Sequence, residues 1–138
     1  MKFLSAASYS AYAPVVLRVG LSLVFLWFGS QQLLHKASWT SFIPDIVVSL
    51  SGLSAVTLVV FNGAFEVVFG LALLAGFYTQ LSALILALHM FDIAYVVGYD
   101  AIGVRDFGLA VATLAIALNA TPDIWSVDHF LASRNRTE

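Results

Sequence analysis

Residues 53–77 read LSAVTLVVFNGAFEVVFGLALLAGF, a long apolar run that contains one ionisable side chain, Glu66. An α-helix needs about 20 predominantly apolar residues to cross the hydrocarbon core of a bilayer, and this run is long enough. A soluble domain carries about 25% charged residues, whereas only 10% of this chain is charged. The run therefore predicts a membrane-spanning helix, and the composition predicts a surface that contacts lipid.

Three further apolar runs predict helices of similar length. The short turn at Tyr78-Thr79-Gln80 makes the second and third helices antiparallel neighbours. We predict that residues 1–138 form one domain of the all-α class, an integral membrane four-helix bundle. The predicted helices cover about 14–34, 53–77, 79–99 and 104–120.

The remaining segments indicate how the chain meets the membrane. The connection at 39–51 contains Trp39, a residue typical of the membrane interface. This connection either lies in the interface or folds back over the bundle. After the fourth predicted helix, the chain ends in a polar C-terminal tail. Four spans place both termini on one side of the cell membrane. Lys2, Arg134 and Arg136 lie near the termini, so the positive-inside rule favours the cytoplasmic side for both.

Composition excludes several classes of function. The chain has no cysteine, which excludes disulfide exchange, thiolate nucleophiles and iron–sulfur clusters in this chain. Its net charge of −2 and lack of a basic patch argue against nucleic-acid binding. The three histidines lie at unmatched depths, so we predict no metal site and no haem. The N-terminal run contains Arg18 and lacks a cleavage site, so it does not predict a secretory signal.

Polar and small residues share one face of each predicted helix, because positions three, four and seven apart lie on the same side. Ionisable groups at membrane depth cost roughly 2.5–3.5 kcal/mol each on insertion scales, so these faces should meet inside the bundle. The predicted buried polar cluster, which is also the candidate ligand-binding site, consists of Arg18, Gln32, Glu66, His89, Asp92, Arg105 and Asp106.

A rise of about 1.5 Å per residue places these groups at two depths. We predict a pair between Arg18 and Glu66 near the middle of the bundle, with His89 between this pair and a second cluster. The second predicted cluster contains Gln32, Asp92, Arg105 and Asp106. Each group has a structural alternative: the Arg18–Glu66 pair can simply hold helices together, His89 can bond a backbone carbonyl, and Asp106 can stabilise a helix N-terminus.

Four short motifs occur in a characteristic order. They are LRVGL at 17–21, FLWFG at 25–29, NGAFE at 62–66 and VRDFGL at 104–109. In order and spacing they resemble the DoxX-like family of small four-span membrane proteins, which includes DoxD-type subunits of quinone-linked oxidoreductases. That family usually carries a lysine three residues after the glycine of the first helix, where this chain has Gln32, with Lys36 one helical turn further on.

The resemblance implies an accessory or quinone-interacting subunit in an electron-transfer system. Thiosulfate:quinone oxidoreductase and terminal quinol oxidase assemblies are the best-known associations of the family. The expected partners are the lipid bilayer, other membrane or peripheral subunits, and a second copy of the chain. No covalent cofactor is predicted, and quinone is the candidate non-covalent one.

Three functional hypotheses follow, and the sequence does not decide whether the chain is itself an enzyme. In the first, a quinone or another amphipathic small molecule binds beside Glu66, His89 and Asp92. In the second, the chain is a structural subunit that stabilises a larger membrane complex. In the third, it is a small proton-coupled transporter in which Glu66 titrates, although small multidrug transporters place that carboxylate in their first helix.

Overall fold

The computed structural model describes residues 10–119 and 123–134, and every regular element within these ranges is a helix. Lys2, Arg136 and the predicted end of the fourth helix lie outside the described residues. The helices are α2 (Ala13–Leu34), α3 (Lys36–Trp39), the 3-10 turn η1 (Thr40–Phe42), α4 (Asp45–Ser51), α5 (Ala55–Ala75), α6 (Thr79–Val97), α7 (Ala101–Ala117) and α8 (Val127–Arg134).

Three helices, α2, α5 and α6, are long and apolar enough to cross a membrane. α7 is shorter, at 17 residues. The all-helical prediction is confirmed for the described residues, and three of the four predicted spans are candidates by length and composition. A fourth span, and with it the complete four-helix bundle, stays a prediction.

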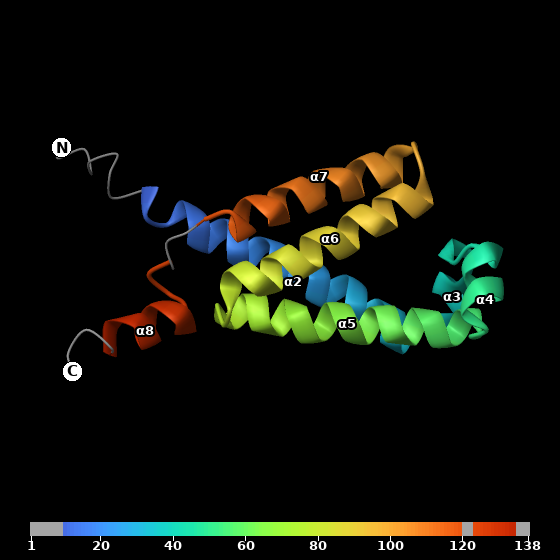
Figure 1. The fold of residues 1–138 in the computed structure, drawn as a ribbon, viewed down its shortest axis with the longest axis horizontal. Helices are drawn as coiled ribbons and strands as arrows, with labels where there is room; N and C mark the ends of the chain where they lie inside the picture. The colour runs from blue at the N-terminus through green and yellow to red at the C-terminus, as the bar shows by residue number, and fades with distance from the viewer. Residues whose placement is uncertain (1–9, 120–122, 135–138) are drawn as a thin grey trace.

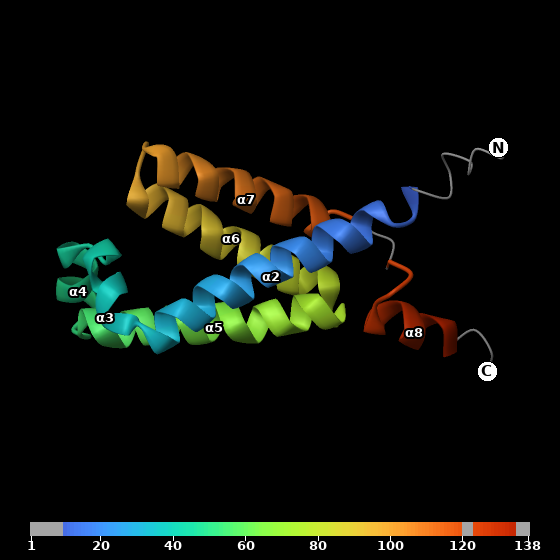
Figure 2. The same cartoon turned by 180° about the vertical axis from the view of Figure 1, so that it is seen from behind.

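The long helices lie side by side in two pairs, α2 with α5 and α6 with α7 (Figure 1). Contacts between α5 and α6 and between α2 and α7 join the pairs into one packed group. Figure 2 shows the same arrangement from behind, with α3 and α4 at one end of the group and α8 at the other, near the start of α2. The short helices therefore cover opposite ends.

Two glycines set the register between α2 and α5. A Cβ atom added to Gly29 would lie 2.8 Å from the carbonyl oxygen of Gly63, and one added to Gly63 would lie 2.9 Å from the Cβ of Gln32. Small residues let membrane helices approach this closely, backbone against backbone. The contact brings Gln32 of α2 next to the turn of α5 that carries Glu66.

Local side-chain bonds fix where α5 and α7 begin. The Ser54 hydroxyl accepts a hydrogen bond from the backbone N–H of Thr57 at 3.1 Å, as an N-cap residue does. Asp100 caps α7 in the same way by accepting from the N–H groups of Ile102 and Gly103, both at 2.8 Å. α7 consequently begins at Ala101, before the predicted position 104.

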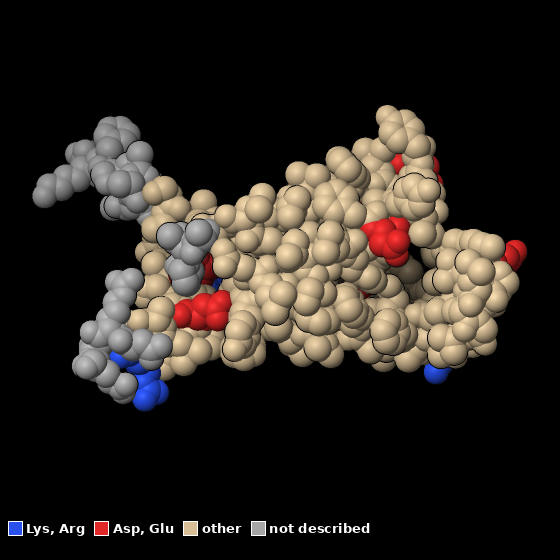
Figure 3. Space-filling model, viewed as in Figure 1, with Lys and Arg blue, Asp and Glu red and all other residues tan. Residues whose placement is uncertain are grey.

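The surface of the packed group is mainly apolar. Phe25, Leu73 and Leu86 are buried in the core, whereas Trp27 and Leu88 expose more than half of their surface. Figure 3 shows a middle region almost free of charged residues, with acidic and basic side chains concentrated towards the two ends. Exposed apolar residues over a band between charged ends are consistent with contact with the lipid bilayer.

Candidate functional site

A cavity of about 420 Å³ lies between α5, α6, α7 and the segment that contains α3 and α4. Trp39, Ile43 and Val47 of that segment line the cavity. Of the two positions predicted for residues 39–51, the structure therefore shows the one over the polar interior. Figure 3 shows a hollow beside an acidic side chain, next to the end that carries α3 and α4.

Glu66 is the most deeply buried polar group in the cavity wall, with only 2% of its surface exposed. Its carboxylate accepts hydrogen bonds from the side-chain amides of Gln32, at 3.1 Å, and Asn62, at 3.0 Å. The Asn62 amide also donates to the Gln32 side-chain oxygen at 2.6 Å. Amide donors on both carboxylate oxygens supply hydrogen bonds that water would otherwise make.

His89 of α6 faces this carboxylate but is not hydrogen-bonded to it. His89 Nε2 lies 3.6 Å from Glu66 Oε1, and this nitrogen is buried without a hydrogen-bond partner among the described residues. The imidazole ring packs against Phe65, with ring centroids 4.6 Å apart. A buried polar atom without a partner is rare in proteins and needs an explanation, such as a bound molecule or a catalytic role. The alternative of a satisfied core histidine does not describe this nitrogen.

The second predicted cluster lines the same cavity. Arg105 and Asp106 form an ion pair, with Arg105 Nη2 2.8 Å from Asp106 Oδ1. The Arg105 guanidinium also lies over the Phe28 ring, 5.1 Å from its centroid. Asp92 is exposed at the cavity wall. Asp106 lies beyond the first turn of α7, which contains no acidic residue, so its alternative role at the helix N-terminus is wrong.

The predicted pair between Arg18 and Glu66 is wrong. Arg18 Nε lies 2.7 Å from the carboxylate of Asp123, and the guanidinium also donates to the backbone carbonyls of Leu73, Leu74 and Trp125. Since Gly29 lies against Glu66, Arg18 is about three helical turns away. The depth estimate failed because it did not include the glycine contact that sets the register.

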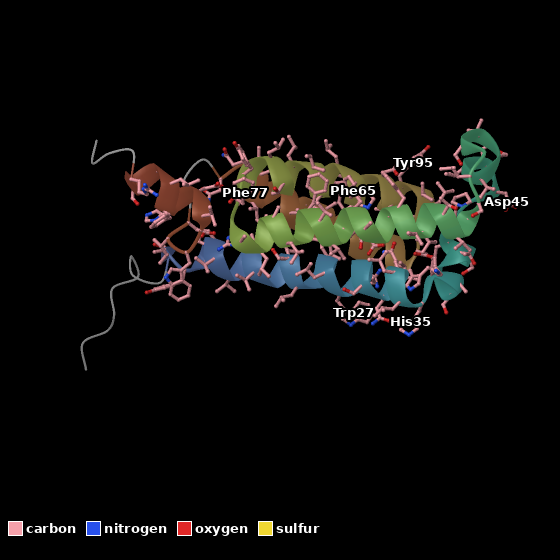
Figure 4. The ribbon with its side chains drawn as sticks, turned by 90° about the horizontal axis from the view of Figure 1, so that it is seen from below. Trp27, His35, Asp45, Phe65, Phe77 and Tyr95 are labelled. Atoms are coloured by element: carbon pink, nitrogen blue, oxygen red, sulfur yellow. The ribbon has the colours of Figure 1, made fainter. Side chains whose placement is uncertain are left out.

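Two participants were missed by the sequence prediction. Asn62 begins the NGAFE motif but was not among the candidate site residues, although it lies one turn before Glu66. Asp123 was also not among them, because it follows the predicted fourth helix in a connection that carries no helical pattern. His35 takes no part in the cavity, and Figure 4 shows that it projects from α2 away from α5, as Trp27 does.

Chemically, the cavity combines a buried carboxylate, an imidazole and largely apolar walls. Within the described residues there is no group of three or more His, Cys, Asp or Glu side chains able to hold a metal ion. Carboxylate and imidazole side chains can each bind and release a proton, and the unpartnered histidine nitrogen can form a hydrogen bond with a small molecule.

Comparison with known protein families gives a match to the DoxX family model over residues 13–99. The chain belongs to the DoxX family. The match covers Gln32, Glu66, His89 and Asp92, and it ends before Arg105 and Asp106. Together with the three spanning-length helices, membership in the DoxX family indicates a membrane protein. Neither the curated proteins nor the solved structures contain a match to the chain.

Proposed function

We propose that this DoxX-family protein binds a quinone, or a similar amphipathic small molecule, in the cavity beside Glu66 and His89. The observation that carries the proposal is the buried Nε2 of His89, which has no hydrogen-bond partner among the described residues and lies at a largely apolar cavity. A quinone carbonyl accepts a hydrogen bond from such a nitrogen when it carries a proton. The apolar walls suit the ring and the beginning of its hydrocarbon tail.

The size and lining of the cavity support this ligand class. A volume of about 420 Å³ falls in the range of roughly 300–1,000 Å³ that is usual for small-molecule sites. Phe28, Trp39 and Phe61 supply aromatic surface for a planar ring. Arg105, half-exposed at the same cavity, offers a second donor for a polar substituent.

We further propose that α7 is the fourth membrane span. Its 17 residues extend for about 25 Å, close to the hydrocarbon thickness of roughly 30 Å. Pairing of Arg105 with Asp106 reduces the cost of placing these charges near its first turns. Both termini would then lie on one side, which the basic residues favour as the cytoplasmic side of the cell membrane.

In this proposal the chain is a subunit associated with a quinone-linked electron-transfer system. Within the described residues no metal-binding group is present, and a partner subunit or a non-covalent cofactor would supply or accept the electrons. The protein's own residues would hold the quinone and position its oxygen atoms. A purely accessory subunit, with an empty cavity and stable partner chains, is the competing outcome.

Tryptophan fluorescence provides a direct test, because quinones quench nearby indoles. Trp39 lines the cavity, whereas Trp125 is exposed beside the start of α8, at the opposite end of the protein. A protein with only Trp39 (W27F/W125F), reconstituted in lipid nanodiscs and titrated with decylubiquinone, should show saturable quenching. The matched protein with only Trp125 (W27F/W39F) should show linear quenching caused by quinone dissolved in the lipid.

The substitution His89→Leu tests the contact that the proposal depends on. In the Trp39-only protein it should weaken saturable quenching at least tenfold, whereas Leu88→Ala, at an exposed neighbouring position, should leave it unchanged. Linear quenching of both Trp39 and Trp125 would overturn the proposal. If other chains then co-purified in mild detergent at fixed stoichiometry, the accessory role would be favoured.

A further inference from the structure

Three ionisable groups follow one another from the interior of the cavity to its surface. Glu66 is buried at the inner wall, His89 lies 3.6 Å from it and is partly exposed, and Asp92 is exposed. His89 and Asp92 are three residues apart on α6, so they share one face of the helix. All three residues line the same cavity.

We infer that Glu66, His89 and Asp92 form a proton path between the buried carboxylate and the aqueous surface at the end that carries α3 and α4. This path is a second property of the cavity in addition to ligand binding, because it is present without any ligand. A proton would reach Glu66 from that end only.

The contacts of Glu66 make His89 its proton donor. Gln32 and Asn62 turn amide N–H groups towards the carboxylate, and an amide N–H does not release a proton under ordinary conditions. Among the groups around Glu66, the protonated imidazole of His89 is the one that can release a proton. In the transfer, the N–H bond at His89 Nε2 breaks and an O–H bond forms at Glu66 Oε1, with no change of oxidation state.

His89 is then recharged from the cavity surface. Its imidazole has two nitrogens, so it can receive a proton on one and release a proton from the other. The charged groups that line the cavity beside it are Glu66 on α5, Asp92 on its own helix, and the Arg105–Asp106 pair on α7. Arg105 is held by Asp106, which leaves Asp92 as the exposed carboxylate able to collect protons from water.

The opposite direction is closed by the core. Phe25, Leu73 and Leu86 are buried between the cavity and the end of the protein where Arg18 lies, with at most 1% of their surface exposed. Arg18 is itself fully engaged with Asp123 and three backbone carbonyls, so it offers no site for proton transfer. The path is therefore one-sided.

Infrared spectroscopy can follow this path in the whole protein without a quinone. The protein is reconstituted in lipid, a proton pulse is released by photolysis of a caged acid, and the carbonyl stretch of protonated Glu66 is recorded. The band is assigned by its loss in Glu66→Gln. His89→Leu should slow its appearance at least tenfold, and Asp92→Asn should slow it several-fold.

Asp45→Asn is the matched control, because Asp45 is an exposed carboxylate at the same end that does not line the cavity (Figure 4). In the Asp45→Asn protein, the carbonyl band of protonated Glu66 should appear at the wild-type rate. An unchanged rate in the His89→Leu protein would overturn the path, and so would the absence of a Glu66 band at any pH. If His89→Leu does not fold, an unchanged rate in Asp92→Asn overturns it. No quinone is added in this experiment, so its outcomes do not bear on quinone binding. Quinone binding is tested separately by the fluorescence titration.

Discussion

The protein has two buried polar networks at different levels, and they differ in how completely their hydrogen bonds are satisfied. In the terminal network, Arg18 bonds Asp123 and three backbone carbonyls through all of its nitrogen atoms. In the cavity network of Gln32, Asn62, Glu66 and His89, the Nε2 atom of the histidine has no hydrogen-bond partner in the part of the chain that the structure describes. A saturated network can only hold segments together, whereas an unsaturated one beside a cavity can still bind or exchange.

The terminal network holds the C-terminal segment against the turn between α5 and α6. Asp128 accepts hydrogen bonds from the backbone N–H groups of Tyr78 and Thr79, at 2.9 and 2.7 Å, and its own N–H donates to Gly76. Together with Arg18, these bonds connect three parts of the chain that are distant in sequence. We therefore expect substitutions in the terminal network to change mainly stability, and substitutions in the cavity network to change mainly binding.

The largest effect is expected for Arg18→Met. The substitution leaves the Asp123 carboxylate, whose side chain is 4% exposed, without its cation. Removing one partner of a buried ion pair typically costs about 3–5 kcal/mol. The free energy of unfolding, measured by denaturant titration in mixed micelles, should fall by that amount.

Arg18→Lys separates charge from geometry. Lysine keeps the charge but has one nitrogen, so it cannot reach the carboxylate and all three carbonyls at once. We expect a stability between those of the wild type and Arg18→Met, with quinone quenching of Trp39 unchanged in the folded protein. If Arg18→Met were as stable as the wild type, the structural role of the terminal network would be wrong.

The sequence predicted the helices and their inward faces well, because both depend on local pattern. Gln32 and Glu66 were assigned to the interior from helical spacing, and both are buried. Asp106 was assigned to the second cluster from its depth, and it is buried as well. Asp92 was placed on the same kind of face but is exposed, because the cavity opens beside it. Helical spacing defines a face, but it does not show whether that face meets another helix or a cavity.

The register between helices could not be predicted, because it depends on contacts between distant residues. The approach of Gly29 to Gly63 decides that Gln32, and not Arg18, reaches Glu66. The partner of Arg18 lies in a connection after the last long helix, and no periodic pattern marks it. Whole-helix depth estimates consequently placed Arg18 and Glu66 in the interior, where both are buried, but joined Arg18 to the wrong partner.

An intermediate effect is expected for Gly29→Ala. The new Cβ would lie 2.8 Å from the Gly63 carbonyl oxygen, so α2 and α5 must move apart. Overpacking of this kind costs about 1–3 kcal/mol, and the Gln32–Glu66 bond should lengthen. Gly108→Ala is the control, because nothing lies within 4 Å of its added Cβ. Equal unfolding free energies for the two variants would contradict the close approach of these helices.

The smallest effect on stability is expected for Glu66→Gln. This substitution distinguishes the two networks most clearly. The new side chain fills the same volume, and its oxygen can still accept from the amide of Gln32 or Asn62, so the loss should stay below about 1 kcal/mol. Binding should change more, because the negative charge beside His89 is lost, and a protonated imidazole that could donate to the ligand is then less favoured. We expect saturable quenching of Trp39 by decylubiquinone to weaken several-fold in a protein that unfolds almost like the wild type. A loss of stability as large as that of Arg18→Met would mean that the cavity network, too, serves mainly to hold α2 and α5 together.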